Sequence, residues 1–198
     1  LEEPDSGCIE VMGKDITKIN QTEWNELRTE VGFLFQGSAL YDSMSVRENL
    51  EFPLRRHPKK FGDIIDATSL VEDALNSVGL VDAIDLMPDE LSGGMKRRVA
   101  LARTLILQPK IILYDEPTTG LDPITSKEII LLMMSIQKQY HTSSIIITHD
   151  VDCARVIANR MILLIDGINY AEGTFEELSR SNDSKIKAFF KQSKKKKK

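Results

Sequence analysis

Residues 111–116 read Ile-Ile-Leu-Tyr-Asp-Glu, and this stretch is the strongest local signal in the sequence. Its apolar run predicts a buried strand, and the two acidic residues stand where that strand would end. Open α/β sheets bind their ligands at the carboxyl ends of the strands. Because successive strand side chains point to opposite faces, we expect Asp115 and Glu116 to have different tasks.

The two carboxylates suit the chemistry of phosphate cleavage. Asp115 can hold Mg²⁺, directly or through water, because this hard cation prefers oxygen ligands. Glu116 can then act on a water molecule as a general base. The alternative is an ordinary solvated acidic loop at the end of a strand.

Two further apolar runs predict neighbouring strands. One of them, residues 144–148, is followed by His149 and Asp150. Residues 127–139, which lie between this run and residues 111–116, have helical spacing. This strand, helix, strand order is typical of a parallel sheet with crossover helices. Residues 31–35 form another compact apolar run, which predicts a buried strand. The predicted fold class is therefore α/β.

The rest of the chain predicts shorter elements. We expect a strand at 9–12, a helix at 22–28 capped by Thr22, and helices at 46–52 and 70–78. Residues 55–60 are charged and predict an exposed loop. A helix is expected from about residue 94 to 107, opened by Ser92 and stopped by Pro109. Residues 160–172 predict a hairpin turning at 166–167, and a terminal helical piece begins at 175.

Residues 91–98, Leu-Ser-Gly-Gly-Met-Lys-Arg-Arg, are a candidate phosphate site. Gly93 and Gly94 at a helix start let a ligand approach the backbone closely. The free N–H groups and the helix dipole suit a phosphate, and Ser92 adds a hydroxyl donor. The alternative is a capped helix after a flexible turn, with residues 96–98 as a solvated basic face.

Composition excludes several classes of protein. The chain has 198 residues, of which 41% are hydrophobic, so a real core is possible. It has 26 basic and 30 acidic residues, and five of the basic ones form the lysine tail 194–198, so the body is acidic and a nucleic-acid partner is disfavoured. We expect the tail to be disordered, with binding to anionic lipid headgroups as the alternative.

Cysteine usage and hydropathy bear on the compartment. Cys8 and Cys153 lie far apart in the sequence, which argues against a disulfide scaffold and fits a reducing cytosol. No apolar run reaches the length of a membrane span, and no signal peptide opens the chain. If the protein works at a membrane, we expect a partner to hold it there.

Five short elements are weak signals one by one, but their order along the chain is a specific signal. They are Gln36 after an apolar strand, residues 91–95, Asp115-Glu116, residues 119–122, and His149 after another strand. This order resembles that of the ATP-binding-cassette (ABC) ATPases, and the resemblance covers nearly the whole chain. It implies a RecA-like P-loop NTPase core, with a mostly parallel sheet and an inserted ABC helical subdomain at about residues 37–103.

The resemblance also implies roles for single residues. Gln36 matches the Q-loop that contacts Mg²⁺, and Asp115 and Glu116 match the Walker B metal ligand and catalytic base. The remaining matches are the family signature, the D-loop and the switch histidine, at Ser92, Gly93, Gly94, Asp122 and His149. Each has a structural alternative, namely a polar strand end at Gln36, a type I turn at 121–123 and a satisfied loop histidine at 149.

One family element is absent from the sequence. The phosphate-cradling loop needs G-x-x-x-x-G-K-[ST], but the only Gly-Lys pair, Gly13-Lys14, is followed by Asp15 and has Cys8 in place of the first glycine. We therefore expect residues 1–193 to be an N-terminally truncated ABC ATPase domain with little or no ATP hydrolysis of its own. An inactive natural homologue is the alternative.

The resemblance implies ATP and Mg²⁺ as cofactors and a head-to-tail homodimer. Each ATP would lie between one subunit and residues 92–94 of the other. A membrane permease would contact residues 36–49, which places the chain in the cytoplasm, peripheral on the inner face of the bacterial inner membrane. Met95, with residues 52–54, resembles the maintenance-of-lipid-asymmetry cassettes, which power phospholipid trafficking. The alternatives are an ABC ATPase for another solute and a non-catalytic docking module.

Overall fold

The structure is a computed structural model, and it describes residues 4–61 and 66–195. Its strands are β1 (Glu10–Val11), β2 (Lys14–Asp15), β3 (Val31–Leu34), β4 (Ile111–Asp115), β5 (Ser143–Ile147), β6 (Met161–Ile165) and β7 (Ile168–Gly173). Its α-helices are α1 (Gln21–Glu30), α2 (Val46–Arg56), α3 (Pro58–Phe61), α4 (Ala67–Ser77), α5 (Gly93–Leu105), α6 (Pro123–Tyr140), α7 (Val151–Ile157), α8 (Phe175–Ser179) and α9 (Ser184–Lys195). Short 3₁₀ turns span Val81–Ala83 and Pro88–Glu90.

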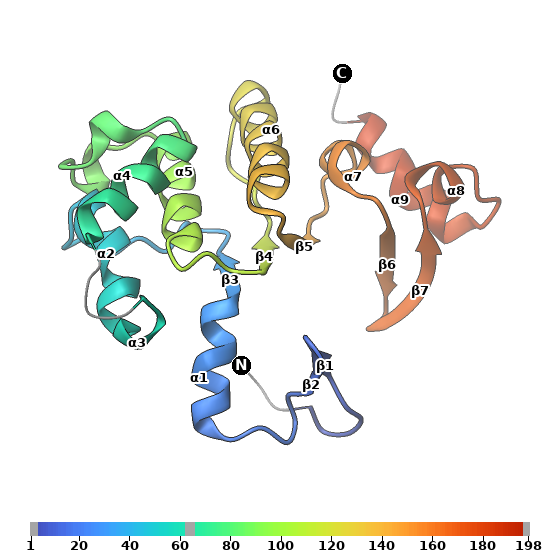
Figure 1. The fold of residues 1–198 in the computed structure, drawn as a ribbon. Helices are drawn as coiled ribbons and strands as arrows, with labels where there is room; N and C mark the ends of the chain where they lie inside the picture. Colours follow the sequence, from blue (N-terminus) through green and yellow to red (C-terminus); the bar gives the residue numbers. More distant parts are fainter. Residues whose placement is uncertain (1–3, 62–65, 196–198) are drawn as a thin grey trace.

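A parallel sheet of order β3-β4-β5 forms the centre of the molecule (Figure 1). Leu34 pairs with Tyr114, and Tyr114 pairs with Ile146, so the three strands end at the same edge. Helix α6 connects β4 to β5 and lies on one side of the sheet, as the strand, helix, strand order predicts. The predicted α/β fold class is confirmed.

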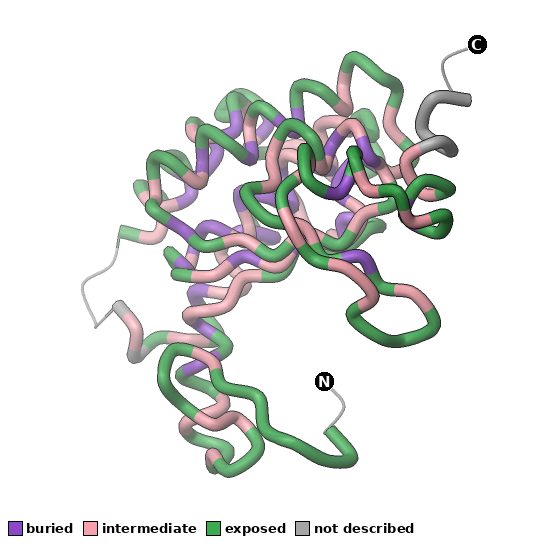
Figure 2. The backbone as a smooth tube through the Cα atoms, turned by 90° about the vertical axis from the view of Figure 1, so that its right-hand side faces the viewer, coloured by how far each residue is buried: buried purple, intermediate pink, exposed green. Residues whose placement is uncertain are grey.

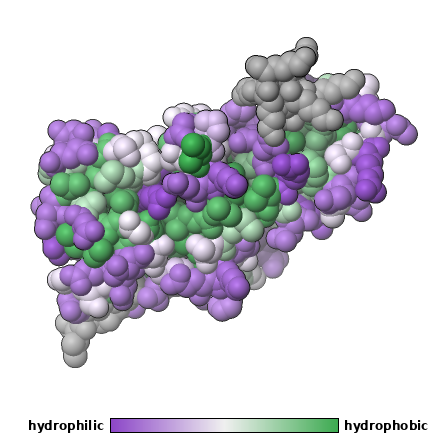
Figure 3. Space-filling view, turned by 90° about the horizontal axis from the view of Figure 1, so that it is seen from above, coloured by the Kyte–Doolittle hydropathy of each residue, from purple (hydrophilic) through white to green (hydrophobic). Residues whose placement is uncertain are grey.

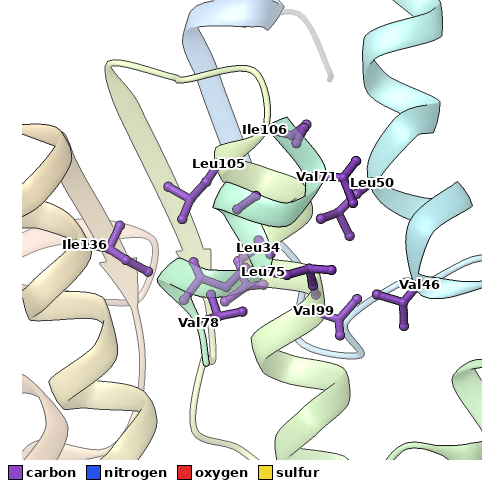
Figure 4. Close-up of a cluster of buried hydrophobic side chains, with 14 of the residues drawn as sticks. Leu34, Val46, Leu50, Val71, Leu75, Val78, Val99, Leu105, Ile106 and Ile136 are labelled. Carbon is purple, nitrogen blue, oxygen red and sulfur yellow. The ribbon is translucent and has the colours of Figure 1, made fainter. Parts of the chain in front are cut away.

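The main core lies between one face of this sheet and the helices α2, α4, α5 and α6. Figure 4 shows Leu34 of β3 among side chains of the helices, including Leu50, Leu75 and Val99. Gly32 allows β3 to come close to the end of α5, because a Cβ at this position would lie 2.5 Å from Cγ2 of Thr104. The burial of these apolar side chains is the main force that holds the helices on the sheet.

The opposite face of the sheet is bare of helices in the described part of the chain. Phe33, Leu113 and Ile145 stand side by side on it, and Figure 1 shows the open space between α1 and the β6-β7 hairpin. The predicted strand at 31–35 is confirmed as β3. Its predicted burial is wrong on this face, because Phe33 and Phe35 are exposed. Parallel strands are normally covered on both faces, and here only one is covered.

A smaller core supports the C-terminal part. Leu163, Leu178 and Ile186 are buried together, and Phe190 packs edge-to-face on Phe175 with ring centroids 5.4 Å apart. The β6-β7 hairpin turns at residues 166–167, as predicted, and both residues have the positive φ that a tight hairpin turn requires. Residues 4–10, in contrast, are exposed throughout (Figure 2).

The surface seen from above is mixed. Hydrophilic side chains line its rim, and hydrophobic areas run through the middle between them (Figure 3). No helix in the described part of the chain combines the length and the apolar character that a bilayer crossing requires.

Several predicted boundaries need correction. Asn20, not Thr22, caps α1, because its side chain accepts hydrogen bonds from the N–H groups of Thr22 and Glu23. The charged loop expected at 55–60 is largely helical, since α2 continues to Arg56 and α3 follows at once. Helix α7 was not predicted. The lysine tail 194–198 was expected to be disordered, but its residues 194–195 are the last residues of α9. Residues 196–198 lie outside the described residues.

Candidate functional site

Glu116 and His149 meet at the carboxyl edge of the sheet. Glu116 directly follows β4, and His149 follows the end of neighbouring β5 by two residues. Nδ1 of His149 lies 2.8 Å from Oε1 of Glu116, and the His149 backbone N–H donates to the same oxygen at 3.1 Å. The parallel register of the two strands therefore brings the two candidate catalytic residues into contact.

The backbone and the neighbours of Glu116 fix its carboxylate. Its φ is +45°, a conformation that is uncommon outside glycine, and its N–H donates to the carbonyl of Ile147 at 2.9 Å. The hydroxyl of Thr119 donates to Oε2 at 2.9 Å. Burial raises the pKa of Glu116, but the hydrogen bonds from His149 and Thr119 outweigh it and hold the pKa below its ordinary value. Glu116 is thus ionised at neutral pH and can accept a proton.

Asp115 and Gln36 stand at the same edge. Asp115 ends β4, is half-buried and pairs in register with Ile147, while Gln36 lies two residues beyond the end of β3 with its side chain exposed. Among the described residues, no group of three or more His, Cys, Asp and Glu side chains could hold a metal ion. The roles of Asp115 and Gln36 as metal ligands stay predictions.

The glycine pair opens α5 as predicted. Oγ of Ser92 accepts a hydrogen bond from the N–H of Met95 at 3.2 Å, so Ser92 is the N-cap. Gly93 and Gly94 form the first turn, and a Cβ at Gly94 would lie 2.7 Å from Cγ2 of Thr125 on α6. The close approach of α5 and α6 therefore requires a glycine at position 94.

A shallow cavity of about 480 Å³ joins this helix start to the loop before α6. Its lining includes Ser92, Gly93, Gly94, Leu121 and Asp122. The four residues predicted to bind nucleotide from this side, 92–94 and 122, thus share one surface, and Glu116 and His149 do not line it. The predicted site residues form two separate clusters within the single chain.

Asp122 has a local structural role. Its Oδ1 accepts hydrogen bonds from the N–H groups of Ile124 and Thr125, and the Thr125 hydroxyl donates to Oδ2. These bonds, the one from the Thr125 hydroxyl first, hold the pKa of Asp122 below its ordinary value. The carboxylate caps α6 from an extended backbone conformation, which differs from the type I turn considered at 121–123. The contact of Asp122 with nucleotide stays a prediction.

Arg97 is the residue of this region that sequence analysis missed. The solvated basic face considered for residues 96–98 is wrong at this position, because Arg97 is only 4% exposed. Its guanidinium donates to the carbonyl of Phe35 at 2.7 Å and to the carbonyl of Gln36. The available signal was helical spacing, since Ala100 and Leu101, three and four residues further on, are buried on the same face.

A groove lies beside Phe35, the residue before Gln36. It has a volume of about 480 Å³ and is lined by Phe35, Ala39, Tyr41, Phe52, Pro53, Arg56, His57 and Arg103. The rings of Tyr41 and Phe52 are 4.8 Å apart, and the Arg103 guanidinium stacks over Tyr41. Burial first, then the charges of Arg56 and Lys60, lowers the pKa of His57, so the arginines carry the positive charge of this groove.

A parallel sheet with crossover helices, and a glycine-initiated helix beside its carboxyl edge, is consistent with the RecA-like fold of the P-loop NTPases. Residues 1–119 match the family model of the ABC transporters, and the chain belongs to this family as an ABC-type ATPase domain.

Three relatives illustrate the range of the family. The chain is 39% identical over 188 residues to the intermembrane phospholipid transport system ATP-binding protein MlaF of Haemophilus influenzae, covering 95% of this chain and 70% of that protein. It is 39% identical to the probable ribonucleotide transport ATP-binding protein mkl of Mycobacterium leprae, covering 96% and 54%. It is 36% identical to the methionine import ATP-binding protein MetN of Clostridium tetani, covering 97% and 59%. The chain thus spans little more than half the length of the last two.

Two solved structures share the fold. A dimer of the ATP-binding cassette MJ0796 in a post-hydrolysis state, bound to ADP and Pi, superposes with a TM-score of 0.77 at 29% identity, covering 88% of this chain and 75% of that one. The cbiO1 subunit of the cbiONQ transporter complex from Clostridium perfringens gives 0.81 at 27% identity, covering 98% and 76%.

Proposed function

We propose that this chain is the ATP-hydrolysing part of an ABC transporter and that hydrolysis takes place at the carboxyl ends of β4 and β5. The observation that carries the proposal is the contact between Glu116 and His149 at this edge, in a chain of the ABC family. Phosphoryl transfer depends chiefly on positioning and on the stabilisation of charge. A fixed, ionised carboxylate next to an imidazole serves both.

The two residues have distinct tasks in this proposal. Glu116 accepts the proton of the attacking water, because it is ionised and its second oxygen is held by Thr119. His149 is exposed on the solvent side of Glu116 and can donate a hydrogen bond to the terminal phosphate. Removing either residue should leave nucleotide bound but unreacted.

Asp115 and Gln36 are the residues that would hold Mg²⁺. Both carry oxygen donors, the type that this ion prefers, and both stand at the ends of neighbouring parallel strands. A site with one or two protein oxygens fits an ion that keeps several waters and takes its other ligands from phosphates. When bound, Mg²⁺ neutralises charge on the phosphate oxygens.

A second subunit is the proposed partner of the cavity at residues 92–94. This surface is open, offers the free N–H groups of a helix start, and does not include Glu116 of the same chain. Two chains placed head to tail would therefore complement each other, with the glycine pair of one subunit facing the strand edge of the other. Nucleotide then closes the dimer, since it contacts both subunits.

The lack of a G-x-x-x-x-G-K-[ST] sequence limits what the chain does alone. Such a loop cradles the phosphates with its backbone N–H groups and its lysine. We therefore propose that the 198 residues by themselves hydrolyse ATP slowly or not at all. This same observation favours a second candidate function, a non-catalytic module that only docks on a transporter.

Phospholipid is the proposed transported substrate. The proposed location of the chain is the inner face of the bacterial inner membrane. The 39% identity to the MlaF protein supports this substrate, together with Met95 at the start of α5. The names of the mkl and MetN relatives keep ribonucleotides and methionine as alternatives. A permease segment would occupy the groove beside residues 36–49, whose aromatic rings and arginines suit an apolar segment with acidic groups.

Nucleotide-dependent association separates the catalytic proposal from the docking module. The chain is mixed with a relative that carries the phosphate loop. This relative also carries a Glu→Gln change at its catalytic carboxylate. Sedimentation measures complex formation with and without Mg²⁺ and ATP. The proposal predicts association only with ATP and its loss in Ser92→Arg. Association independent of nucleotide would support the docking module instead. Lipid analysis of co-purified membrane subunits tests the proposed transported substrate.

A further inference from the structure

Arg97 makes contacts that no other described side chain of α5 makes. From the first turns of the helix, its guanidinium reaches the carbonyls of Phe35 and Gln36 at the end of β3. It also lies 3.5 Å from the carbonyl of Thr119, in the loop that follows β4. One buried side chain of α5 therefore contacts two other segments that are far apart in the sequence.

The two contacted segments and α5 itself each carry a residue of the proposed site. The first holds Gln36, the second begins with Glu116, and α5 itself begins with residues 92–94. Thr119 connects the second segment to the carboxylate, because its hydroxyl donates to Oε2 of Glu116 and its N–H donates to the Glu116 carbonyl. A shift at Thr119 is thus passed on to Glu116 through two hydrogen bonds.

We propose that Arg97 is a positioning residue that sets the distance of the glycine-initiated end of α5 from Gln36 and from the loop 116–122. The two clusters of site residues are then held as one unit, although they lie on separate surfaces. This inference rests on the proposed function for its consequence in hydrolysis, but the contacts themselves do not depend on nucleotide.

The chemistry of the side chain fits this task. An arginine presents five donors in a rigid plane, so one guanidinium can satisfy carbonyls from different directions. Burial lowers the pKa of Arg97, and the negative charge of the nearby Asp115 opposes this effect. A lysine has a single point of charge and cannot hold the same separation.

Hydrogen exchange of the chain without nucleotide tests the proposal. The Ser38 N–H donates to the Phe35 carbonyl and the Thr119 N–H donates to the Glu116 carbonyl, so both amides report on the segments that Arg97 holds. Arg97→Gln should speed their exchange about ten-fold or more, because charge-assisted hydrogen bonds at both turns are lost. Amides of the β6-β7 hairpin should be unaffected.

Controls separate positioning from general stability. Arg98→Gln removes the neighbouring arginine, which bonds to Glu128 and to the Val78 carbonyl, and should leave the Ser38 and Thr119 amides unchanged. If Arg97→Gln does not fold, Arg97→Lys is used, with a smaller effect at the same two amides. Unchanged exchange at both amides, or an equal rise over the whole chain, would overturn the proposal. In a hydrolysing assembly, kcat should fall while KM for ATP stays within two-fold of its original value.

Discussion

Nδ1 of His149 lies 2.8 Å from Oε1 of Glu116, although the two residues are 33 positions apart in the sequence. Helix α6 fills that interval, so the contact exists because β4 and β5 are neighbours that run in the same direction. The arrangement makes the carboxyl edge of the sheet the place where the proposed proton acceptor and the imidazole proposed to bind phosphate meet.

The two glycines at the start of α5 should respond differently to alanine. A Cβ at Gly94 would meet Thr125 at 2.7 Å, so Gly94→Ala should destabilise the fold by about 1–3 kcal/mol through overpacking. At Gly93 the nearest atom would be 3.7 Å away, and Gly93→Ala should be neutral or stabilise by up to about 1 kcal/mol. Urea unfolding of both variants measures this, and equal destabilisation would contradict the described approach of α5 and α6.

Asn49 should be essential for the loop that follows Gln36. It is fully buried, its Oδ1 accepts from the N–H of Tyr41, and its Nδ2 donates to the carbonyls of Tyr41 and Met44. Asn49→Ala leaves these part-buried backbone groups without the Asn49 partner and opens a cavity at a fully buried position, so it should cost about 3 kcal/mol in denaturant unfolding. The exposed change Asp42→Ala serves as the control, with an expected effect within about 0.5 kcal/mol.

Acid should weaken the ion pairs that connect the end of α1 to α3 and to the residue just before β4. Glu30 pairs with Lys60 at 3.0 Å and with Lys110 at 3.2 Å. Burial raises the pKa of Glu30, but these lysines outweigh it and hold the pKa below its ordinary value. The stabilisation is therefore complete above the unfolded pKa and is lost as the pH falls through the lower folded pKa.

Glu30→Gln measures this contribution. At pH 7 the variant should be less stable than the original chain by about 1 kcal/mol, and the difference should shrink steadily below about pH 4. The free energy of unfolding is obtained from urea titrations across this range. A difference that stays constant down to pH 2.5 would show that the charge of Glu30 contributes nothing.

The bare face of the sheet should bind apolar probes. Ile145 and Ile147 are 60% and 65% exposed on it, and exposed apolar patches promote association. The double change Ile145→Lys and Ile147→Lys should reduce both the fluorescence of a bound apolar dye and the concentration-dependent self-association of the chain. Ile124→Lys, at another strongly exposed isoleucine at the start of α6, should leave both unchanged.

Sequence patterns predicted the parts of this structure that depend on local chemistry. The apolar runs that became β4 and β5 and the Ser92 cap of α5 were correct, because a buried strand and a capped helix leave strong signals in a few residues. The pairing of their ends followed from the parallel topology. The predicted tasks of the eight site residues remain predictions, carried by their order in the sequence.

The features that were missed depend on tertiary contacts. The positive φ of Glu116 arises where its N–H bonds to the carbonyl of Ile147 on the next strand, and nothing in residues 111–116 specifies it. Arg97 is buried because three carbonyls from two distant loops surround it. The exposure of Phe33 depends on which helices cover the sheet, and strand propensity says nothing about this.

Glu116 is proposed to act as the catalytic base once phosphates are held in place. A segment carrying G-x-x-x-x-G-K-[ST] from one of the relatives is fused ahead of Leu1, and steady-state ATP hydrolysis is measured for the fused protein, for its Glu116→Gln variant and for the unfused chain. We expect hydrolysis by the fused protein, a loss of about 100-fold or more in Glu116→Gln, and almost none from the unfused chain. Equal rates with and without Glu116, or full Glu116-dependent turnover by the unfused chain, would contradict the account.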